Sequence, residues 1–383
     1  MTGVNSARPA CENGRVKVGD RHYRSLWAEQ PGGPVHIIDQ TRLPYAFETR
    51  ALESPEAVAE AIETMRVRGA PLIGVTAAFG LALAMTRDAS DASLARNCAR
   101  LAATRPTAVN LAWALERMRA VLAGLAPAQR EVAAWSQAQA IADEDVAINA
   151  AIGRHGLTLI EREHAARGRT VNILTHCNAG WIATVDWGTA LAPIYMAHDK
   201  GIAVHVWVDE TRPRNQGLLT AWELAGHGVP HTLVADNAGG HLMQHGKVDL
   251  VLVGADRVTR HGDVANKIGT YLKALAARDN GVPFYVAVPT PTIDWTLTDG
   301  LGAIPIEVRS ADEVRSVRGL DASGRPASLA IATGSTAVAN PAFDVTPAGL
   351  VTGIVTEKGM FAATEQALAP LAPRSRAGRT VTT

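Results

Sequence analysis

The chain is poor in cysteine and aromatic residues and carries no net charge. Its 383 residues include three cysteines, Cys11, Cys98 and Cys177, and no CxxC pair. This odd number at wide spacing argues against a disulfide framework or a zinc site. Lys and Arg together number 37, as do Asp and Glu, so there is no cationic surplus for nucleic-acid phosphates or an anionic membrane surface. We expect neither nucleic acid nor membrane as a partner.

Signals for export and for membrane insertion are also missing. The first fifteen residues lack the apolar segment of a signal peptide. The longest apolar run, residues 69–85, is short for a membrane span, is rich in small residues and opens with a Gly-Ala-Pro turn. It therefore indicates a buried helix of a soluble core. Together these features predict a reducing, cytoplasmic location, with loose ends at residues 1–20 and 373–383.

Two sequence patterns divide the chain into two parts. A short strand is expected near residues 35–44. Ser54-Pro55-Glu56 then reads as a helix start, with a capping serine, proline at the first helical position and an acid in the first turn. From there to about residue 163 the sequence is alanine-rich with helical periodicity. We predict a mainly helical N-terminal domain with a small β element over residues 18–145.

The second part alternates short apolar runs with helical segments. The runs cover residues 171–175, 203–208, 231–235, 248–253 and 283–288. Continuous apolar runs separated by helices are typical of a parallel sheet covered on both faces. The fold class predicted is α/β, with a Rossmann-like, doubly wound parallel sheet over residues 146–372.

Polar residues follow these strands, where parallel sheets bind ligands. The clusters are His176-Cys177-Asn178, Asp209-Glu210-Thr211-Arg212, Asp236-Asn237 and Asp256-Arg257. No phosphate-binding GxxxxGK[ST] motif occurs, and no strand is followed by GxGxxG, so the fold alone is no evidence for a nucleotide. Asp209-Glu210 could hold a cation, although a polar helix entry is the simpler interpretation. We expect no cofactor and no metal.

Cys177 and Asp256 are the strongest candidates for chemistry, because each follows a buried strand in a segment that also contains glycine. From spacing alone, an inert buried thiol and a helix N-cap explain them better. His176 is interpreted as a structural hydrogen-bonding residue. Asn266-Lys267, expected near a helix start, would suit a phosphate, since a helix N-terminus and a cation both attract it. Arg68 and Arg105 are expected at element boundaries.

A series of motifs, in order from about Ser25 to Pro370, resembles the methylthioribose-1-phosphate isomerase family, whose superfamily includes regulatory subunits of the translation-initiation exchange factor. The matching segments are IIDQTRLP, VRGAPLIG, RPTAVNL, THCNAG, VDETRPRNQG, LTAWEL, DNAGG, VGADRV, GDVANKIGTY, IPIE, NPAFDVTP and VTEKG.

The resemblance implies a site and a reaction. It implies catalytic roles for Cys177 and Asp256. The sugar-phosphate contacts that it implies are Arg68, Gly69, Ala70, Arg105, Gln216, Asn266 and Lys267. It further implies a homodimer that converts 5-methylthioribose 1-phosphate to 5-methylthioribulose 1-phosphate in methionine salvage. The low count of cations for the 5-end of the sugar predicts that the enzyme also accepts 5-deoxyribose 1-phosphate.

Two alternatives remain beside this hypothesis. One is a non-catalytic regulatory subunit that binds sugar phosphates or nucleotides; such a chain need not keep both Cys177 and Asp256. The other is an isomerase of ribose 1,5-bisphosphate. A second phosphate would require a second cationic cluster, and none is evident in the sequence.

Overall fold

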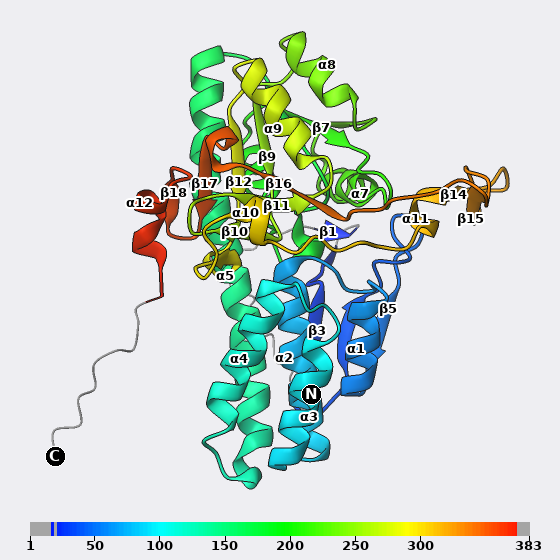
Figure 1. Ribbon diagram of the computed structural model, residues 1–383, viewed down its shortest axis with the longest axis vertical. Helices are drawn as coiled ribbons and strands as arrows, with labels where there is room; N and C mark the ends of the chain where they lie inside the picture. Colours follow the sequence, from blue (N-terminus) through cyan, green and yellow to red (C-terminus); the bar gives the residue numbers. More distant parts are fainter. Residues whose placement is uncertain (1–16, 19–20, 374–383) are drawn as a thin grey trace, which may run out of the picture.

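The computed structural model describes residues 17–18 and 21–373 (Figure 1). Three features of the sequence lie outside the described residues. They are Cys11, the N-terminal segment that is not expected to be a signal peptide, and residues 374–383 of the expected C-terminal tail. The described chain forms a helical part and a sheet-based part, which meet along one helix shared by both.

The N-terminal part consists of small strands followed by a helical bundle, as predicted. Ser54 begins the first helix by accepting a hydrogen bond from the amide of Ala57 on its hydroxyl, at 3.0 Å. The strands are β1 (Lys17–Val18), β2 (Arg21–His22), β3 (Leu26–Ala28), β4 (Val35–Ile38) and β5 (Thr49–Leu52), the last three forming one antiparallel sheet. The helices are α1 (Pro55–Glu63), α2 (Ala70–Arg87), α3 (Asp91–Ala102), α4 (Val109–Leu122) and α5 (Pro127–Arg167).

Helix α2 is the core of this bundle. It packs against α1, α3, α4 and α5. By length and composition it could cross a membrane, but 83% of its most apolar stretch is buried inside the protein. The apolar run is therefore a core helix here, as the sequence predicted.

The second part is built on a seven-stranded sheet. Its strand order is β18-β17-β12-β9-β6-β7-β8, and all neighbours are parallel except β17 and β18. The bounds are β6 (Val171–Thr175), β7 (Val204–Asp209), β8 (His231–Val234), β9 (Leu250–Val253), β12 (Phe284–Ala287), β17 (Gly353–Thr356) and β18 (Gly359–Phe361). The five strands expected from the apolar runs are all in it.

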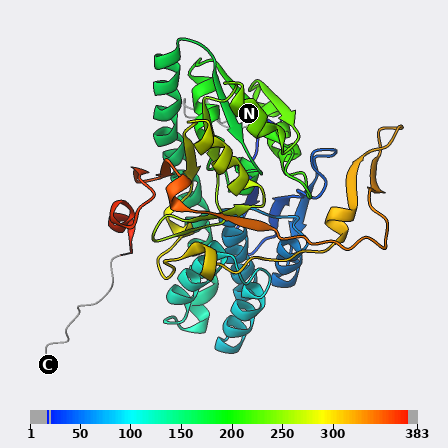
Figure 2. The ribbon, with the colours of Figure 1, turned by 45° about the horizontal axis from the view of Figure 1, so that its top comes forward.

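Helices cover both faces of this sheet, which confirms the doubly wound class (Figure 2). Ile173 points into one core with residues of α5, α6 (Ala192–Asp199) and α7 (Gly217–His227). Its neighbour Leu174 points into the other core with residues of α8 (Ala238–Gln244) and α9 (Thr270–Asp279). The side chains of successive residues in one strand thus point to opposite faces of the sheet, as the pleat of a strand requires.

A second sheet was not predicted. It has four strands in the order β13-β10-β11-β16, namely β13 (Ile293–Asp294), β10 (Arg257–Thr259), β11 (Val264–Lys267) and β16 (Phe343–Thr346). Asn266 and Lys267 lie at the end of strand β11, and α9 starts three residues after Lys267, at Thr270. The two residues are thus near a helix start, as expected, although they themselves belong to a strand. Four short strands of mixed composition give no periodic signal to detect.

The segment between β13 and β16, two strands of the second sheet, forms an arm. It contains α10 (Gly300–Ala303), α11 (Asp312–Arg315) and the antiparallel hairpin of β14 (Ser316–Leu320) and β15 (Pro326–Ala330). The hairpin projects from the body beside the β3-β4-β5 sheet (Figures 1 and 2). The chain then returns to the second sheet and ends with α12 (Glu365–Leu368).

The predicted boundary between residues 145 and 146 falls inside α5. This helix of 41 residues packs against α2 and α4 on one side of that point, and against α6 and β17 on the other. The division into residues 18–145 and 146–372 stays a prediction, with α5 as the element that both parts share.

Candidate active site

One pocket collects almost every site residue predicted from the sequence. It lies where the loops after β6, β7 and β9 meet the start of α2 and strand β11. Its lining includes Arg68, Gly69, Arg105, Cys177, Gln216, Asp256, Asn266 and Lys267. Ala70 lines an adjoining cavity together with Gly69, Arg105 and Asp256. Residues nearly 200 positions apart thus converge on one space.

Two buried threonines hold the loop that carries Cys177. The Cys177 backbone adopts a left-handed conformation with φ of 66°, which costs a non-glycine residue roughly 1–2 kcal/mol. Its amide donates to Thr211 Oγ1 at 2.9 Å, and its carbonyl accepts from Thr220 Oγ1 at 2.8 Å. Both threonines are fully buried. The strained turn presents the thiol to the pocket, and the hydroxyl pair fixes that turn.

The Cys177 side chain is neutral at rest. Burial raises the pKa of the thiol, while the cations Arg68 and Lys267 act in the opposite direction. A neutral thiol between two cations can lose its proton or take up developing negative charge with little reorganisation.

Asp256 is placed to act as an acid. Burial raises the pKa of its carboxyl, and the nearby cations Lys267, Arg105 and Arg68 offset part of that rise. Its amide donates to the carbonyl of Ala265 at 3.0 Å, and the next element is strand β10. Since no helix begins there, Asp256 is not a helix cap.

Three cations surround this pair. Arg68 is 9% exposed and donates through its guanidinium to the side-chain and backbone oxygens of Asn178. Lys267 lies over the ring of Phe343, with Nζ 4.3 Å from the ring centroid, and burial lowers its pKa. Arg105 donates to Glu307 Oε2 at 2.9 Å. Such a concentration of buried positive charge suits an anionic ligand.

Several buried polar atoms of the pocket have no protein partner among the described residues. They are Arg68 Nε, Arg105 Nε and Gln216 Oε1. Buried polar groups are normally hydrogen-bonded, so donors and acceptors left over in a pocket mark positions for the polar groups of a ligand. Asn266, also buried in this wall, donates through Nδ2 to Thr270 Oγ1 at 3.0 Å.

Gly69 brings the start of α2 to the pocket. Its φ is 99°, and a side chain there would place Cβ only 2.2 Å from the carbonyl oxygen of Ala183. Only glycine fits this contact. The first turn of an 18-residue helix thereby faces the ligand space, where its amides favour a negative charge.

A buried carboxyl supports the Cys177 loop from behind. Glu223 accepts hydrogen bonds from Asn178 Nδ2, the Trp181 amide and the Tyr195 hydroxyl, each at 2.8 Å. Burial raises its pKa to about 7 although these donors favour the ionised form. Because Asn178 also holds Arg68, Glu223 links the loop to the cationic wall.

Glu223 should make folding stability depend on pH. Between about pH 4.5 and 7 its carboxyl is ionised in the unfolded chain but protonated in the folded one, so its contribution to stability falls as pH rises. Replacing Glu223 by Gln should therefore flatten the decline of Tm between pH 5 and pH 7.5. Thermal unfolding of both proteins at the two pH values measures this. If Tm falls equally between the two pH values in both proteins, Glu223 is not the titrating group.

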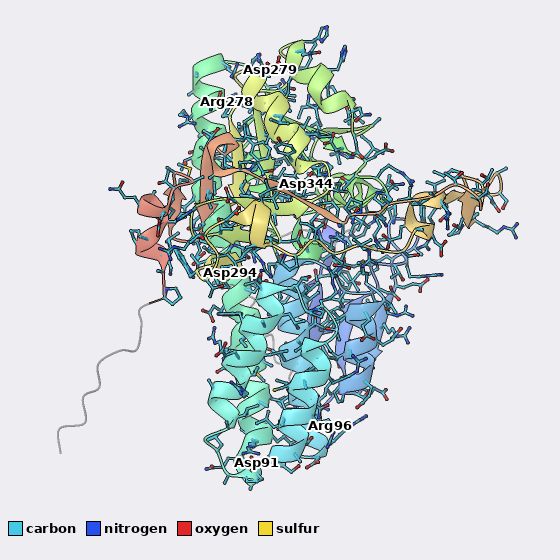
Figure 3. All side chains as sticks on the ribbon, in the orientation of Figure 1. Asp91, Arg96, Arg278, Asp279, Asp294 and Asp344 are labelled. Carbon is cyan, nitrogen blue, oxygen red and sulfur yellow. The ribbon has the colours of Figure 1, made fainter. Side chains whose placement is uncertain are left out.

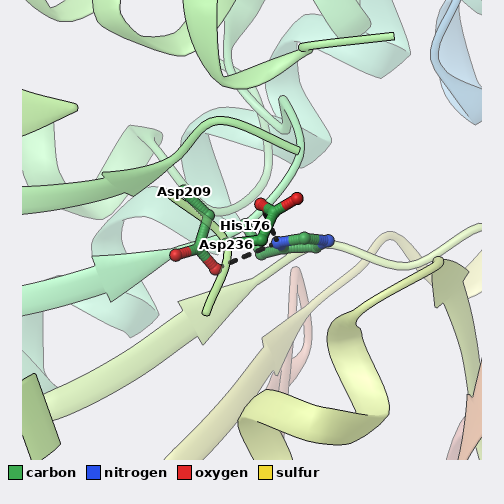
Figure 4. Close-up of side chains that lie close together, drawn as sticks. All are labelled: His176, Asp209 and Asp236. Atoms are coloured by element: carbon green, nitrogen blue, oxygen red, sulfur yellow. Dashed lines mark hydrogen bonds and ion pairs between the residues drawn. The ribbon is translucent and has the colours of Figure 1, made fainter. Parts of the chain in front are cut away.

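His176 also lines the pocket, and its side chain forms a cluster with Asp209 and Asp236 (Figure 4). Its Nδ1 lies 3.0 Å from Asp209 Oδ2 and 4.0 Å from Asp236 Oδ1, and its Nε2 lies 2.8 Å from the carbonyl of Ile268. It is a structural hydrogen-bonding residue, as predicted.

The same cluster is the one described group with metal-binding spacing. Most of its polar atoms have partners in the protein: Lys273 Nζ lies 3.2 Å from Asp209 Oδ2, and the Asp236 oxygens accept the amides of Thr211 and Arg212. Asp209 Oδ1 is buried without a hydrogen-bond partner among the described residues. The absence of a metal requirement stays a prediction. Asp209 ends β7 rather than entering a helix, so that interpretation of Asp209-Glu210 is wrong.

The supporting residues of the site could not be identified from the sequence. Glu307, Phe343, Thr211, Thr220 and Glu223 lie in quoted motifs, but none has a signal of its own. Asp344, labelled in Figure 3, is another: on β16 it accepts the amide of Gly269 at 2.7 Å and anchors the start of α9 beside Lys267. Only the pairing of distant segments reveals these roles.

Comparison with known proteins identifies the family of the chain. The model of the Initiation factor 2 subunit family matches residues 66–363. The methylthioribose-1-phosphate isomerase of Methylobacterium nodulans is 63% identical over 362 residues, which cover 94% of this chain and 99% of that protein.

Two solved structures are similar over most of their length. The 5-methylthioribose 1-phosphate isomerase of Pyrococcus horikoshii is 40% identical with a TM-score of 0.78, covering 91% of this chain and 95% of that one. The translation initiation factor eIF-2B subunit delta of A. fulgidus is 38% identical with a TM-score of 0.74, covering 91% and 99%. The fold is therefore shared by proteins named for catalysis and for translation initiation.

Proposed function

This chain belongs to the initiation factor 2 subunit family, and we infer that it is the aldose–ketose isomerase converting 5-methylthioribose 1-phosphate to 5-methylthioribulose 1-phosphate. The reaction is a step of methionine salvage. The observation that carries the inference is Cys177 and Asp256 in one pocket with Arg68, Arg105 and Lys267. A subunit that only binds a ligand has no need of a strained cysteine turn or of a carboxyl whose pKa is raised by burial.

The chemistry follows from the substrate's blocked anomeric centre. Because phosphate occupies the anomeric oxygen, the sugar cannot open to a free aldehyde. Asp256 in its protonated form donates to the ring oxygen as the bond from C1 to that oxygen breaks. One hydrogen then moves from C2 to C1, the C2 hydroxyl loses its proton, and C2 becomes the carbonyl of the ketose.

Cys177 assists the transfer from C2 to C1, either as the base that carries a proton or by stabilising charge on a migrating hydride. The pocket's cations and the start of α2 hold the phosphate and offset its charge. The proposed mechanism therefore uses only groups of the protein.

A substrate panel tests the proposed function. The protein, after chelation and dialysis, is incubated with 5-methylthioribose 1-phosphate, 5-deoxyribose 1-phosphate and ribose 1,5-bisphosphate, and ketose 1-phosphate is measured. We expect turnover of the first two. A protein that turns over none of them is not this isomerase. Activity that is lost on chelation and restored by one divalent ion would contradict the metal-free mechanism.

Lys267 should anchor the substrate phosphate. Lys267→Ala removes a buried charge-assisted contact, so KM for 5-methylthioribose 1-phosphate should rise about 10- to 100-fold. Arg260→Ala is the matched control. Arg260 lies in the β10–β11 turn, pairs with Glu365 and does not line the pocket. Steady-state kinetics of both variants decide the point. If Lys267→Ala and Arg260→Ala have equal KM values, the phosphate does not bind at Lys267.

Thr211 should act as a positioning residue through its hydroxyl. Thr211→Val keeps the shape but leaves the Cys177 amide without its acceptor, so kcat should fall about tenfold or more. Thr211→Ser keeps the hydroxyl and should restore most of the rate. If both variants lose activity equally, packing of the methyl group rather than the hydrogen bond explains the effect.

We also propose a cytoplasmic homodimer that binds neither nucleic acid nor a membrane. Helix α9 supports the dimer, because it exposes Tyr271, Leu272 and Leu275 on its surface, and exposed apolar patches commonly mark interfaces. The free thiols of Cys98 and Cys177 suit a reducing compartment. Light scattering on the purified protein and on Leu272→Glu tests the dimer.

A further inference from the structure

A ladder of alternating charges leads away from Arg105 in the wall of the pocket. It begins at Arg105, which donates to Glu307 at 2.9 Å; Glu307 accepts from Arg309 at 2.7 Å. Arg309 donates to Glu313 at 2.8 Å, and Glu313 accepts from Arg214 at 2.7 Å. The ladder connects a cation of the reaction pocket with a cation some 110 residues later in the sequence.

The far end of the ladder lies in a second cavity. This cavity shares Met65, Arg68 and Gln216 with the reaction pocket, so the two are adjacent. It contains none of Arg105, Asp256 and Lys267. Its apolar lining consists of Leu43, Pro44, Met65, Pro213, Leu218 and Leu219.

If the proposed function holds, each of the two cavities binds one end of the substrate. The 1-phosphate requires the cations of the reaction pocket, and C1 and C2 must lie at Cys177 and Asp256. The remaining end of the sugar, C5 and its substituent, then extends past Met65 and Gln216 into the second cavity. An apolar methylthio group matches the leucine, proline and methionine side chains there.

The second cavity also contains arginines, which the sequence analysis did not recognise as a cluster. Arg214 and Arg318 both line it. Arg318 donates to the carbonyl of Thr41 and lies 5.9 Å from the ring of Tyr45. Arg68 lines the cavity as well, and these three arginines, left unopposed, would favour a second phosphate on the substrate.

Glu313 opposes them. Its carboxylate is 14% exposed and accepts from Arg214, Arg309 and Asn340 Nδ2, the last at 3.0 Å. The arginines hold the pKa of Glu313 at about 2 against the effect of burial, so it is ionised throughout the working pH range. An anionic group entering the cavity would meet this fixed negative charge.

We propose that Glu313 is the residue that makes this isomerase select pentose 1-phosphates with an uncharged 5-substituent. It neutralises Arg214 and presents a carboxylate to the second cavity. A 5-phosphate is therefore rejected by repulsion, while 5-methylthio and 5-deoxy groups pass to the apolar lining. Discrimination by a built-in unfavourable contact is a common route to specificity.

The test compares two substrates on one isosteric variant. Glu313→Gln keeps the shape and removes the charge. The ratio of kcat/KM for ribose 1,5-bisphosphate to that for 5-methylthioribose 1-phosphate should rise about tenfold or more. Glu365→Gln is the control, because Glu365 is likewise paired with an arginine, Arg260, but lies outside both cavities. Its ratio should equal that of the wild type.

A second substitution tests whether the gain comes from Arg214. In the double variant Glu313→Gln, Arg214→Gln, the raised ratio should return toward the wild-type value. An unchanged ratio in Glu313→Gln, or a raised ratio that survives loss of Arg214, overturns the proposal. Wild-type turnover of 5-methylthioribose 1-phosphate in the same assays shows separately that the proposed function stands.

One measurement needs no variant, should Glu313→Gln fail to fold. Raising the salt concentration of the wild-type assay screens charge repulsion at the cavity. Both substrates carry the 1-phosphate, so its screening cancels in the ratio of kcat/KM values. The ratio for ribose 1,5-bisphosphate over 5-methylthioribose 1-phosphate should rise with salt; a constant or falling ratio contradicts a charge filter.

Discussion

Replacing Asp256 by Asn is expected to lower kcat for 5-methylthioribose 1-phosphate by about 10²-fold or more, with KM changed only a few-fold. The amide has the same shape but no proton to transfer to the ring oxygen. Burial raises the pKa of the Asp256 carboxyl and so favours its protonated form. For the same reason, wild-type kcat should fall as pH rises through that pKa.

The competing explanation of Asp256 is purely structural. Its side chain accepts no hydrogen bond from the protein among the described residues, so a structural role would rest on charge or packing. A structural role predicts a lower Tm and near-normal kcat in the protein that remains folded. Measuring Tm and kcat on one preparation separates the two, and normal turnover would remove Asp256 from the mechanism.

Cys177→Ser should also lower kcat by about 10²-fold or more while substrate binding is preserved. Serine fits the left-handed turn between Thr211 and Thr220 as well as cysteine does. It lacks the acidic, polarisable sulfur that can take a proton or stabilise charge. Cys98→Ser is the control, since Cys98 packs in the helical part far from the pocket. Full activity of Cys177→Ser would show that the thiol takes no part.

The sequence predicted the parts of the fold that have a periodic signal. Apolar runs identified five adjacent strands of the seven-stranded sheet, and Ser54-Pro55 located the start of α1. Cys177 and Asp256 could be placed together because parallel strands end at one edge. The strands of the second sheet are short and mixed in composition. Nothing local distinguishes Asn266-Lys267 on β11 from a helix start.

Contacts between distant segments could not be predicted from the sequence. Glu307 meets Arg105 across 202 positions, and Glu313 meets Arg214 across 99. Each of these residues alone reads as an ordinary surface charge. The second cationic cluster, which decides between a methylthio and a phosphate substituent, became visible only once α11 and the hairpin were placed beside Arg214 and Tyr45.

The central claim is that the pocket catalyses isomerisation and does not merely bind a sugar phosphate. A single-turnover experiment tests it most directly, with enzyme in excess over 5-methylthioribose 1-phosphate. Wild type and the double variant Cys177→Ser, Asp256→Asn are mixed with substrate, and bound aldose and released ketose 1-phosphate are quantified. We expect wild type to convert the substrate, while the double variant binds it and leaves it unchanged over the same time. Binding without conversion by the wild type, or equal conversion by both proteins, would contradict the account.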